Sequence, residues 1–350
     1  MNISAVIINY NGVNLIEGTI DSLRSGEVVP VEIIVVDNGS SDNSVAFLEQ
    51  KFPDITLIKL PKGKNSKSLE TANYARHVGL VQATSPLVLV TDNDIIFHKH
   101  CLKNLYNHMS RSELIACCTP RLFYFSRPNI INMDGGIFHY IGSMVAVNRD
   151  LPLSEVTEKV PRKSSGCGIN LLRRDVALKI GSYDCDYLLG WGDDVSLHIV
   201  LQLAGYECWQ VPKATALHHA RRLESDNPFR VKAQIFNRWR MFLTVYQRKT
   251  LLLSLPVLCI YEMCLIAFSL KIKAFKEYRK GFQLVFKSLP AFKEKRKSLQ
   301  QLRKVSDRIF LNCGPIYTDS RLRKNKLLYT LFIAMNSFIN LYWKVIEKWL

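Results

Sequence analysis

The feature that most restricts the fold is a series of short apolar segments that alternate with helix-like segments over the first 94 residues. The apolar segments cover residues 4–8, 31–36, 55–60 and 86–91, and turn-forming residues follow several of them. Between them, residues 14–25, 44–51 and 68–82 place apolar side chains at helical spacing. Continuous apolar strands that alternate with helices are typical of a parallel sheet covered by helices on both faces. We therefore predict an α/β fold with a mostly parallel sheet.

Polar clusters follow three of these predicted strands. They are Asn9-Tyr10-Asn11, Asp37-Asn38-Gly39-Ser40 and Asp92-Asn93-Asp94. In open parallel sheets the ligand binds beyond the carboxyl ends of the strands, so the three clusters are expected to meet at one rim. Asp37 has two interpretations there, as an acceptor of a hydrogen bond from a nucleotide base or ribose, or as a turn residue.

The triplet Asp92-Asn93-Asp94 has the chemistry of a divalent-cation site. Mg²⁺ and Mn²⁺ prefer carboxylate and phosphate oxygens, and a diphosphate leaving group needs its charge neutralised. An Asx-rich turn that caps the next helix would use the same residue types. Its position after the fourth predicted strand favours the metal interpretation, with Asp92 and Asp94 as ligands of Mn²⁺ or Mg²⁺.

Two further motifs lie downstream. Asp193 and Asp194 follow a Gly-Trp-Gly loop and open a predicted helix. Carboxylates at a helix start commonly act only as caps, but one of this pair is also placed to be the general base that deprotonates an acceptor hydroxyl. The pair His218-His219 follows a predicted strand over 206–216. We expect His218 to join the metal ligands, with His219 as the alternative.

The positive charge of the chain is confined to its last third. Residues 1–225 carry 22 Lys and Arg against 23 Asp and Glu, whereas residues 226–350 carry 25 against seven. We therefore predict two regions with different partners, 1–225 as the catalytic domain and 226–350 as a basic helical region, with a boundary near Asn227-Pro228. Nine scattered cysteines without a CxxC pair indicate reduced thiols in a cytosolic setting, and the N-terminus lacks the pattern of a signal peptide.

The basic region contains three helix-like segments. Residues 251–270 are long enough to cross a bilayer, but Pro256 and Glu262 lie inside the segment and both flanks are basic. Residues 271–289 have the pattern of a basic amphipathic helix. Residues 327–343 are apolar with a polar stripe formed by Asn336, Asn340 and Lys344. We predict attachment to the membrane surface, with spanning as one alternative and packing against the catalytic domain or an oligomer contact as another.

Taken together, residues 1–222 resemble the family 2 glycosyltransferases, which have the GT-A fold. Five ordered segments carry the resemblance: residues 6–12, Glu32 to Asp42, Ala75 to Leu80, Gly166 to Asp184, and Trp191 to His219. The chain departs from the family pattern at His77, where Asn is more frequent, and at Asp193, where Glu is usual.

The resemblance implies roles for individual residues. Asp194 would be the catalytic base of an inverting transfer, with Asp193 in a supporting or acceptor-binding role. The remaining implied roles are nucleotide binding by Asn9, Asn11, Asp37, Asn38, Asp92 and Asn93, and acceptor binding by Gly166, Trp191, Gly192 and Asp193. The implied partners are a nucleotide-diphosphate sugar and a lipid-linked or surface-glycan acceptor at the cytoplasmic face of a membrane.

Two other function classes are less consistent with the sequence. A nucleotidyltransferase would also need a cation and a nucleotide, but residues 9–12 lack the Gly-rich phosphate loop expected after the first strand. A nucleic-acid-binding protein would interleave basic residues with exposed aromatic residues, whereas here they alternate with aliphatic and Phe residues at helical spacing. Neither the sugar nor the acceptor can be deduced from the sequence.

Overall fold

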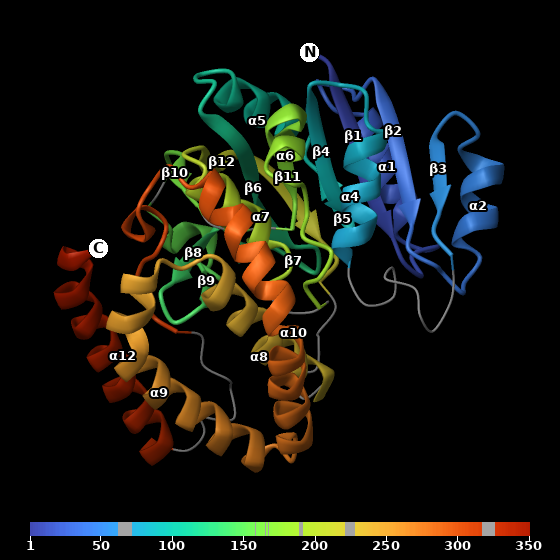
Figure 1. Ribbon diagram of the computed structural model, residues 1–350. Helices are drawn as coiled ribbons and strands as arrows, with labels where there is room; N and C mark the ends of the chain where they lie inside the picture. The colour runs from blue at the N-terminus through green and yellow to red at the C-terminus, as the bar shows by residue number, and fades with distance from the viewer. Residues whose placement is uncertain are drawn as a thin grey trace.

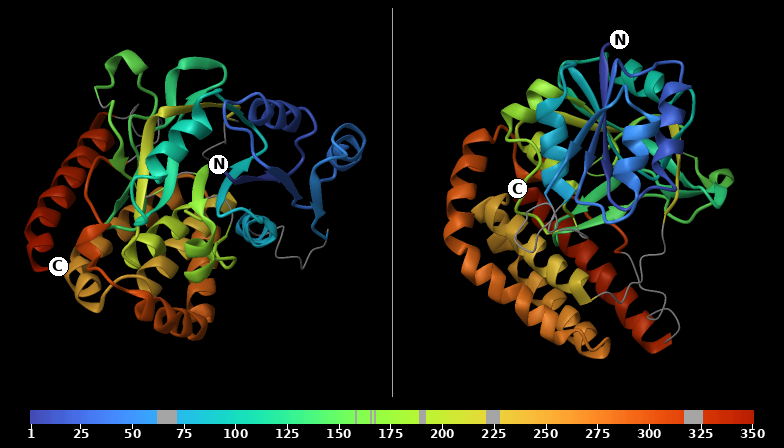
Figure 2. Two further views of the ribbon diagram at one scale, coloured as in Figure 1. Left: turned by 90° about the horizontal axis from the view of Figure 1, so that it is seen from above. Right: turned by 90° about the vertical axis from the view of Figure 1, so that its right-hand side faces the viewer.

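The computed structural model describes residues 1–61, 72–157, 159–164, 166, 168–188, 192–220, 228–316 and 326–350. A mixed α/β domain forms one side of the molecule, and four long helices from the C-terminal third pack against its other side (Figure 1). The two turned views show that these helices form a layer of their own beyond one end of the sheet (Figure 2).

Ten strands form the main sheet, in which the path β10-β12-β6-β11-β4-β1-β2-β3 is extended by β5 beside β12 and β7 beside β6. The pairs β1–β2, β1–β4, β2–β3 and β6–β12 are parallel, whereas β11 lies antiparallel between β4 and β6. A separate hairpin is formed by β8 and β9. The strands are β1 (Ile3–Asn9), β2 (Glu32–Asp37), β3 (Thr56–Lys59), β4 (Leu87–Asp92), β5 (Ile95–Phe97), β6 (Ile115–Tyr124), β7 (Arg127–Met133), β8 (Gly136–His139), β9 (Ser143–Ala146), β10 (Arg162–Lys163), β11 (Asn170–Arg173) and β12 (Glu207–His218).

The helices occur on both faces of the sheet and in the C-terminal layer. They are α1 (Ile16–Arg24), α2 (Ser44–Lys51), α4 (Ala72–Gln82), α5 (Cys101–Met109), α6 (Arg174–Lys179), α7 (Val195–Leu203), α8 (Pro228–Thr244), α9 (Arg248–Lys271), α10 (Phe275–Leu302) and α12 (Lys326–Ile346). Short 3₁₀ turns cover Leu153–Glu155, Asp307–Ile309 and Glu347–Trp349.

Strand β1 illustrates how the sequence pattern produces the layers. Ala5 and Ile7 point into a core that is covered by α1, α2 and α5, whereas Val6 and Ile8 point into a second core under α4, α6 and α7. Because successive side chains alternate between the faces of a sheet, a strand that is apolar throughout must be buried on both. The predicted α/β fold with helices on both faces is therefore confirmed.

The C-terminal helices share a hydrophobic core with the sheet domain. Val195 and Ile199 of α7 pack in one buried cluster with Phe242 of α8, Leu258 of α9 and Trp343 of α12. Helix α8 begins at Pro228, next to the predicted boundary. The basic region is therefore packed against the sheet domain by apolar contacts.

Two residues of the polar stripe predicted for the last helix point inward. Asn336 and Asn340 of α12 accept hydrogen bonds from the backbone N–H groups of Ile316 and Gly314. The third residue, Lys344, is exposed. The exposed large apolar residues of α12 are Leu327, Leu331, Ile333, Phe338, Leu341 and Val345. The two amides of α12 thus serve as acceptors for backbone donors of the preceding segment.

Helix α9 carries its carboxylate on the protein side. Glu262 pairs with the fully buried Arg238 of α8 and accepts a hydrogen bond of 2.8 Å from the hydroxyl of Tyr278. Arg248–Lys271 is the one helix, among the described residues, that is long and apolar enough to cross a membrane, and 22% of its most apolar stretch is buried. Its exposed apolar residues are Leu252, Leu255, Met263 and Leu270.

Some apolar residues of helix α10 are buried, and others are exposed. Tyr278, Gly281 and Val285 are buried, and Gly281 lies so close to Ile235 of α8 that a Cβ atom would approach that side chain to 2.9 Å. Phe286 remains 66% exposed. The amphipathic face predicted for the membrane is therefore partly occupied by α8.

Candidate active site

The carboxyl ends of β1, β2 and β4 lie in register at one edge of the sheet. Asn9 is opposite Asp37, and Ile8 is opposite Asp92. The Asn9 amide Nδ2 donates to Asp37 Oδ1 at 2.8 Å, and Asn93 Nδ2 donates to Asn9 Oδ1 at 2.6 Å. Asn9 thus connects the three predicted clusters through buried hydrogen bonds.

The loop after β1 packs directly on this amide pair. A Cβ atom at Gly12 would lie 1.8 Å from Asn93 Nδ2 and 2.6 Å from Asn9 Oδ1. Only glycine fits at this approach. The Gly12 position therefore keeps the first and fourth strand ends in contact.

The loop after β2 uses the Asp37 carboxylate internally. Asp37 is only 2% exposed, and it accepts hydrogen bonds from the Ser40 backbone N–H and hydroxyl. Asn11 Oδ1 accepts from the Ser41 backbone N–H at 2.7 Å. In contrast, Asn38 Oδ1 is buried and has no hydrogen-bond partner within the described part of the chain. The Asn38 side-chain oxygen is therefore the atom of this loop that is best suited to accept a hydrogen bond from a ligand. Nucleotide contacts by the residues of these loops remain predictions.

Asp94 and His218 face each other in a way that suits a cation. His218 Nδ1 lies 2.8 Å from Asn132 Oδ1, an acceptor, so Nδ1 carries the proton. In a neutral imidazole the lone pair is then on Nε2, which lies 3.4 Å from the carboxylate oxygen Asp94 Oδ2. The other oxygen, Asp94 Oδ1, is buried without a hydrogen-bond partner among the described residues. Two electron-rich groups face one space here, which fits a divalent cation held by Asp94 and His218.

His219 has a different environment from its neighbour. Its ring stacks on Phe125 with centroids 3.6 Å apart, and its backbone N–H donates to the Asp94 carbonyl oxygen at 2.9 Å. The structure thus brings His218 to the predicted metal site and gives His219 a packing position.

Asp92 lies between the predicted cation site and a buried arginine. Arg76 Nη2 is 3.3 Å from Asp92 Oδ1. Burial raises the pKa of the Asp92 carboxyl and Asp94 raises it further, although Arg76 and His218 oppose this change. A buried carboxyl with a raised pKa beside a second carboxylate is typical of a site that gains its counter-charge from a ligand.

Arg76 also connects the metal side of the site to the Asp193-Asp194 pair. Its Nη1 group lies 3.1 Å from Asp193 Oδ2 and donates to Asn73 Oδ1 at 3.0 Å. Asn73 in turn donates to the Asp193 carbonyl oxygen at 2.9 Å. The sequence did not mark Asn73 and Arg76 as site residues; their spacing of three on a helix, which places them on one face, was the available signal.

Asp194 occupies the N-cap of α7. Its Oδ1 accepts a hydrogen bond of 3.0 Å from the Val195 backbone N–H. Burial and the neighbouring Asp193 carboxylate raise the pKa of Asp194 to about 6, against the opposing effects of Arg76 and His198. A carboxylate with a pKa near neutrality is suited to general-base catalysis, whereas Asp193 is held by Arg76.

Gly168 brings the two carboxylate groups to one space. A Cβ atom built on Gly168 would lie 3.5 Å from Asp92 Oδ2 and 4.0 Å from Asp194 Oδ2. The cation side and the base side therefore border the same glycine. With a divalent cation held on one side, this arrangement could bind an anionic leaving group there and remove a proton on the other side.

The predicted acceptor-binding residues are only partly described. Gly166 is buried against Met144 and Val195, and Gly192 has a left-handed backbone with a φ of 70° and open space around its Cα. Trp191 lies outside the described residues. Acceptor contacts remain predictions.

Comparison with known proteins gives a consistent family. Residues 4–168 match the family model described as glycosyl transferase family 2. An uncharacterized glycosyltransferase of Nostoc sp. is 27% identical over 123 residues, which is 33% of this chain and 35% of that protein. A cholesterol galactosyltransferase of Borreliella burgdorferi is 25% identical over 128 residues, which is 37% of this chain and 35% of that protein. The matched segment thus spans about a third of each of these relatives.

Solved structures share the fold at low sequence identity. GalNAc-T7 with UDP, GalNAc and Mn²⁺ superposes with a TM-score of 0.52 at 15% identity, over 70% of this chain and 51% of that one. The mannosyltransferase PcManGT from Pyrobaculum calidifontis, in complex with GDP-Man and Mn²⁺, superposes with a TM-score of 0.50 at 15% identity, over 99% of this chain and 87% of that one. The sheet domain has the GT-A fold.

Proposed function

Since the chain belongs to glycosyltransferase family 2 through residues 4–168, we propose that it moves a sugar from a nucleotide-diphosphate sugar to an acceptor hydroxyl. The observation that carries the proposal is the pairing of two acidic groups across Gly168. On one side Asp92 and Asp94 stand with His218, and on the other side Asp194 has a pKa raised to about 6. One side suits the leaving diphosphate and the other suits the attacking hydroxyl.

The donor would bind along the ends of β1, β2 and β4. Asn9, Asn11, Asp37, Asn38 and Asn93 would contact the nucleotide, with the unpaired Asn38 Oδ1 as the best-supported contact. Asp92, Asp94 and His218 would hold Mn²⁺ or Mg²⁺, which neutralises the charge of a diphosphate leaving group when bound. Mn²⁺ occurs in both of the similar solved structures, with UDP and GalNAc in one and GDP-Man in the other.

Asp194 would act as the base in a direct displacement. The acceptor oxygen forms a bond to the anomeric carbon, the bond from that carbon to the diphosphate oxygen breaks, and the hydroxyl proton passes to Asp194. Asp193 would support the acceptor side while its carboxylate stays paired with Arg76. A single displacement inverts the anomeric configuration and needs no carboxylate nucleophile.

The outward surface of α9 and α12 supports a membrane location. Apolar side chains are exposed along both helices, and basic residues lie at their ends, among them Arg248, Lys249, Lys271, Lys326 and Lys344. An extended apolar surface with basic flanks is suited to an interface with anionic lipid. We therefore favour a lipid-linked or surface-glycan acceptor at the cytoplasmic membrane face, with attachment to the surface rather than spanning.

A donor screen tests the proposal. The full-length protein is incubated with UDP-, GDP- and dTDP-sugars in the presence of Mn²⁺, and both thermal shift and sugar release are measured. One nucleotide sugar should stabilise the protein and be hydrolysed slowly, and EDTA should abolish both effects. If no nucleotide sugar raises the melting temperature or is consumed, the proposed activity is wrong.

Two variants separate donor binding from chemistry. Asp94→Asn should weaken both Mn²⁺ and nucleotide binding, because it removes charge from the cation side. Asp194→Asn should retain both and lose transfer. Equal nucleotide affinity in all three proteins would contradict the role of Asp94.

A further inference from the structure

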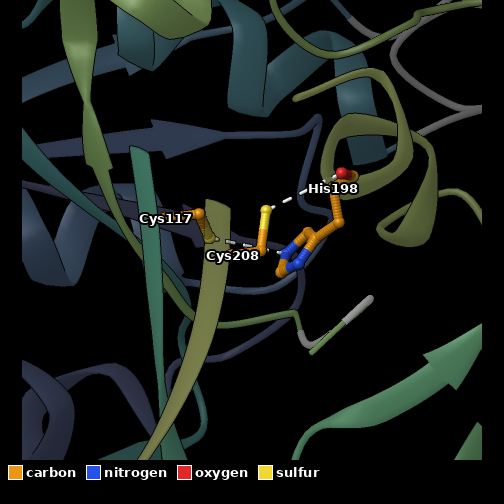
Figure 3. Close-up of side chains that lie close together, drawn as sticks. All are labelled: Cys117, His198 and Cys208. Carbon is orange, nitrogen blue, oxygen red and sulfur yellow. Dashed lines mark hydrogen bonds between the residues drawn. The ribbon is translucent and has the colours of Figure 1, made fainter. Parts of the chain in front are cut away.

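A second group of metal-binding side chains lies in the core, apart from the rim. Cys117 of β6 and Cys208 of β12 stand opposite each other on neighbouring parallel strands, and His198 of α7 lies beside them (Figure 3). Cys117 and His198 are 0% exposed and Cys208 is 1% exposed. One ligand atom from each residue lies within 4.8 Å of the other two. Neither thiol forms a disulfide.

Only one of the two ring nitrogens of His198 has a hydrogen-bond partner among the described residues. His198 Nε2 lies 2.7 Å from Asn170 Oδ1, an acceptor that requires a proton on Nε2. The Nδ1 atom is buried and has no hydrogen-bond partner within the described ranges. A buried nitrogen lone pair without a partner costs free energy unless a ligand occupies it. An outer hydrogen bond on one nitrogen that leaves the other for a cation is the usual arrangement of a metal-binding histidine.

Both thiols of the cluster lie against polar groups in the core. Cys117 Sγ is 3.4 Å from Asn170 Oδ1, and Cys208 Sγ is 3.7 Å from the His198 carbonyl oxygen. Metal ions bind cysteine as the thiolate.

Spacing and charge both suit Zn²⁺. Zn–S and Zn–N bonds of about 2.3 Å and 2.0–2.1 Å in a tetrahedron place sulfur and nitrogen roughly 3.5 Å apart. The ligand atoms of Cys117, His198 and Cys208 lie within 4.8 Å of one another, so small side-chain shifts would bring them to this spacing. Two thiolates would neutralise the charge of the ion, which removes the main cost of burying it. The two thiol protons would leave as the ion binds.

The same strip of the sheet contains further unpaired polar atoms. Thr119 and Gln210, two residues along from Cys117 and Cys208, are in register with each other and 0% exposed. Their side-chain oxygens and the Gln210 amide nitrogen have no hydrogen-bond partners among the described residues. These groups are suited to a water molecule that would complete the coordination of an ion with three protein ligands.

We propose that Cys117, His198 and Cys208 form a buried site for Zn²⁺, separate from the oxygen-rich cation site at Asp92 and Asp94. The site joins β6 and β12 to α7, whose N-cap is Asp194, one helical turn before His198. A bound ion would therefore fix the position of α7, the helix whose N-cap is the proposed base Asp194. The inference does not depend on the proposed sugar transfer.

Metal content of the full-length protein tests the site. Protein dialysed against EDTA, which strips ions from the exposed rim, is analysed by mass spectrometry of metals. About one equivalent of zinc should remain and should be released by a mercurial thiol reagent. Protein produced in cobalt-supplemented, zinc-depleted medium should show a thiolate-to-cobalt absorption band in the near ultraviolet.

Cys118→Ser is a matched control for Cys208→Ser. Cys118 is 0% exposed but packs in the core on the other side of the sheet. The control should keep the zinc, whereas Cys208→Ser should lose most of it. The cobalt spectrum of the unmodified protein tests the site even if the variants fold poorly.

Three outcomes would overturn the proposal. The first is zinc below a tenth of an equivalent together with no cobalt–thiolate band. The second is equal zinc retention by the Cys208→Ser variant and the unmodified protein. The third is a thiol titration of unreduced, denatured protein that falls two thiols short, which would show that Cys117 and Cys208 form a disulfide.

Discussion

Polar side chains have different surroundings at the rim of the sheet and in the C-terminal helices. At the rim, Asp92 and Asp94 at the end of β4 and Asp194 at the N-cap of α7 come together near Gly168. In the helical layer, Glu262 and the amides of α12 turn inward to partners in the protein, while leucines face outward. At the rim, Asn38 Oδ1 and Asp94 Oδ1 have no hydrogen-bond partner among the described residues, whereas Glu262, Asn336 and Asn340 of the helical layer bind groups of the protein. This difference supports the proposed chemistry in the first region and the proposed membrane contact in the second.

The largest effect is expected at the rim, on the proposed base. Asp194→Asn should lower kcat about 10²- to 10⁴-fold, because the acceptor hydroxyl loses its proton acceptor. Single-turnover sugar transfer measures this change, and nucleotide affinity should stay within a few-fold. Asp42→Asn, in the loop after β2, is a control away from the base, and a comparable loss of kcat there would point to general disruption.

In the helical layer, the largest effect is expected from Glu262→Ala. This change leaves Arg238 buried without its carboxylate, which costs about 3–5 kcal/mol of stability. Urea denaturation measures it, and both regions should unfold together because they share a core. Glu277→Ala, which breaks a partly exposed pair with Lys280, should cost about 0–1 kcal/mol. Equal losses in the two variants would contradict the structural role of Glu262.

The two adjacent histidines should differ in their effect on metal binding. His218→Ala should weaken Mn²⁺ binding on the order of ten- to a hundred-fold, because a group facing Asp94 is removed. Isothermal titration with Mn²⁺ measures the affinity. His219→Ala should change it little, since that ring stacks on Phe125. A larger effect at His219 would reverse the assignment.

The pH profile should show the raised pKa of Asp194. A base works only when deprotonated, so kcat/KM should rise about tenfold per pH unit below pH 6 and level off above it. Transfer rates measured at constant Mn²⁺ between pH 4.5 and 8 give this rise of kcat/KM. Residual activity of Asp194→Asn should lack it, and a flat profile in the unmodified protein would contradict the assignment.

The smallest effect is expected on the outward face of α12. Leu331→Asn and Leu341→Asn together should weaken binding to anionic vesicles by about tenfold, since about 1.4 kcal/mol of apolar transfer free energy corresponds to that factor. Vesicle flotation measures binding. Leu114→Asn, at a similarly exposed position in the sheet domain, should leave it unchanged. Vesicle binding that is unaffected by all three changes would remove α12 from the membrane contact.

The first half of the fold could be predicted because it depends on local periodicity. Apolar runs define β1, β2 and β4, and parallel strands bring their carboxyl ends to one edge. The predicted convergence of Asp37 and the Asp92–Asp94 triplet follows from that geometry alone. The antiparallel β11, which separates β4 from β6, has no comparable local signal.

The sequence by itself therefore determined the parallel strands β1, β2 and β4, the edge at which their polar clusters meet and the acidic residues there. The tertiary structure decided that Arg76 joins Asp92 to Asp193, that His218 rather than His219 faces Asp94, and that α12 turns its amides inward. The physical reason is that these features depend on which face a helix or strand end presents to residues far away in the chain. The residue spacing within one segment cannot predict that face. The face is set by which side chains become buried and by which polar groups of the partner segment need a hydrogen bond.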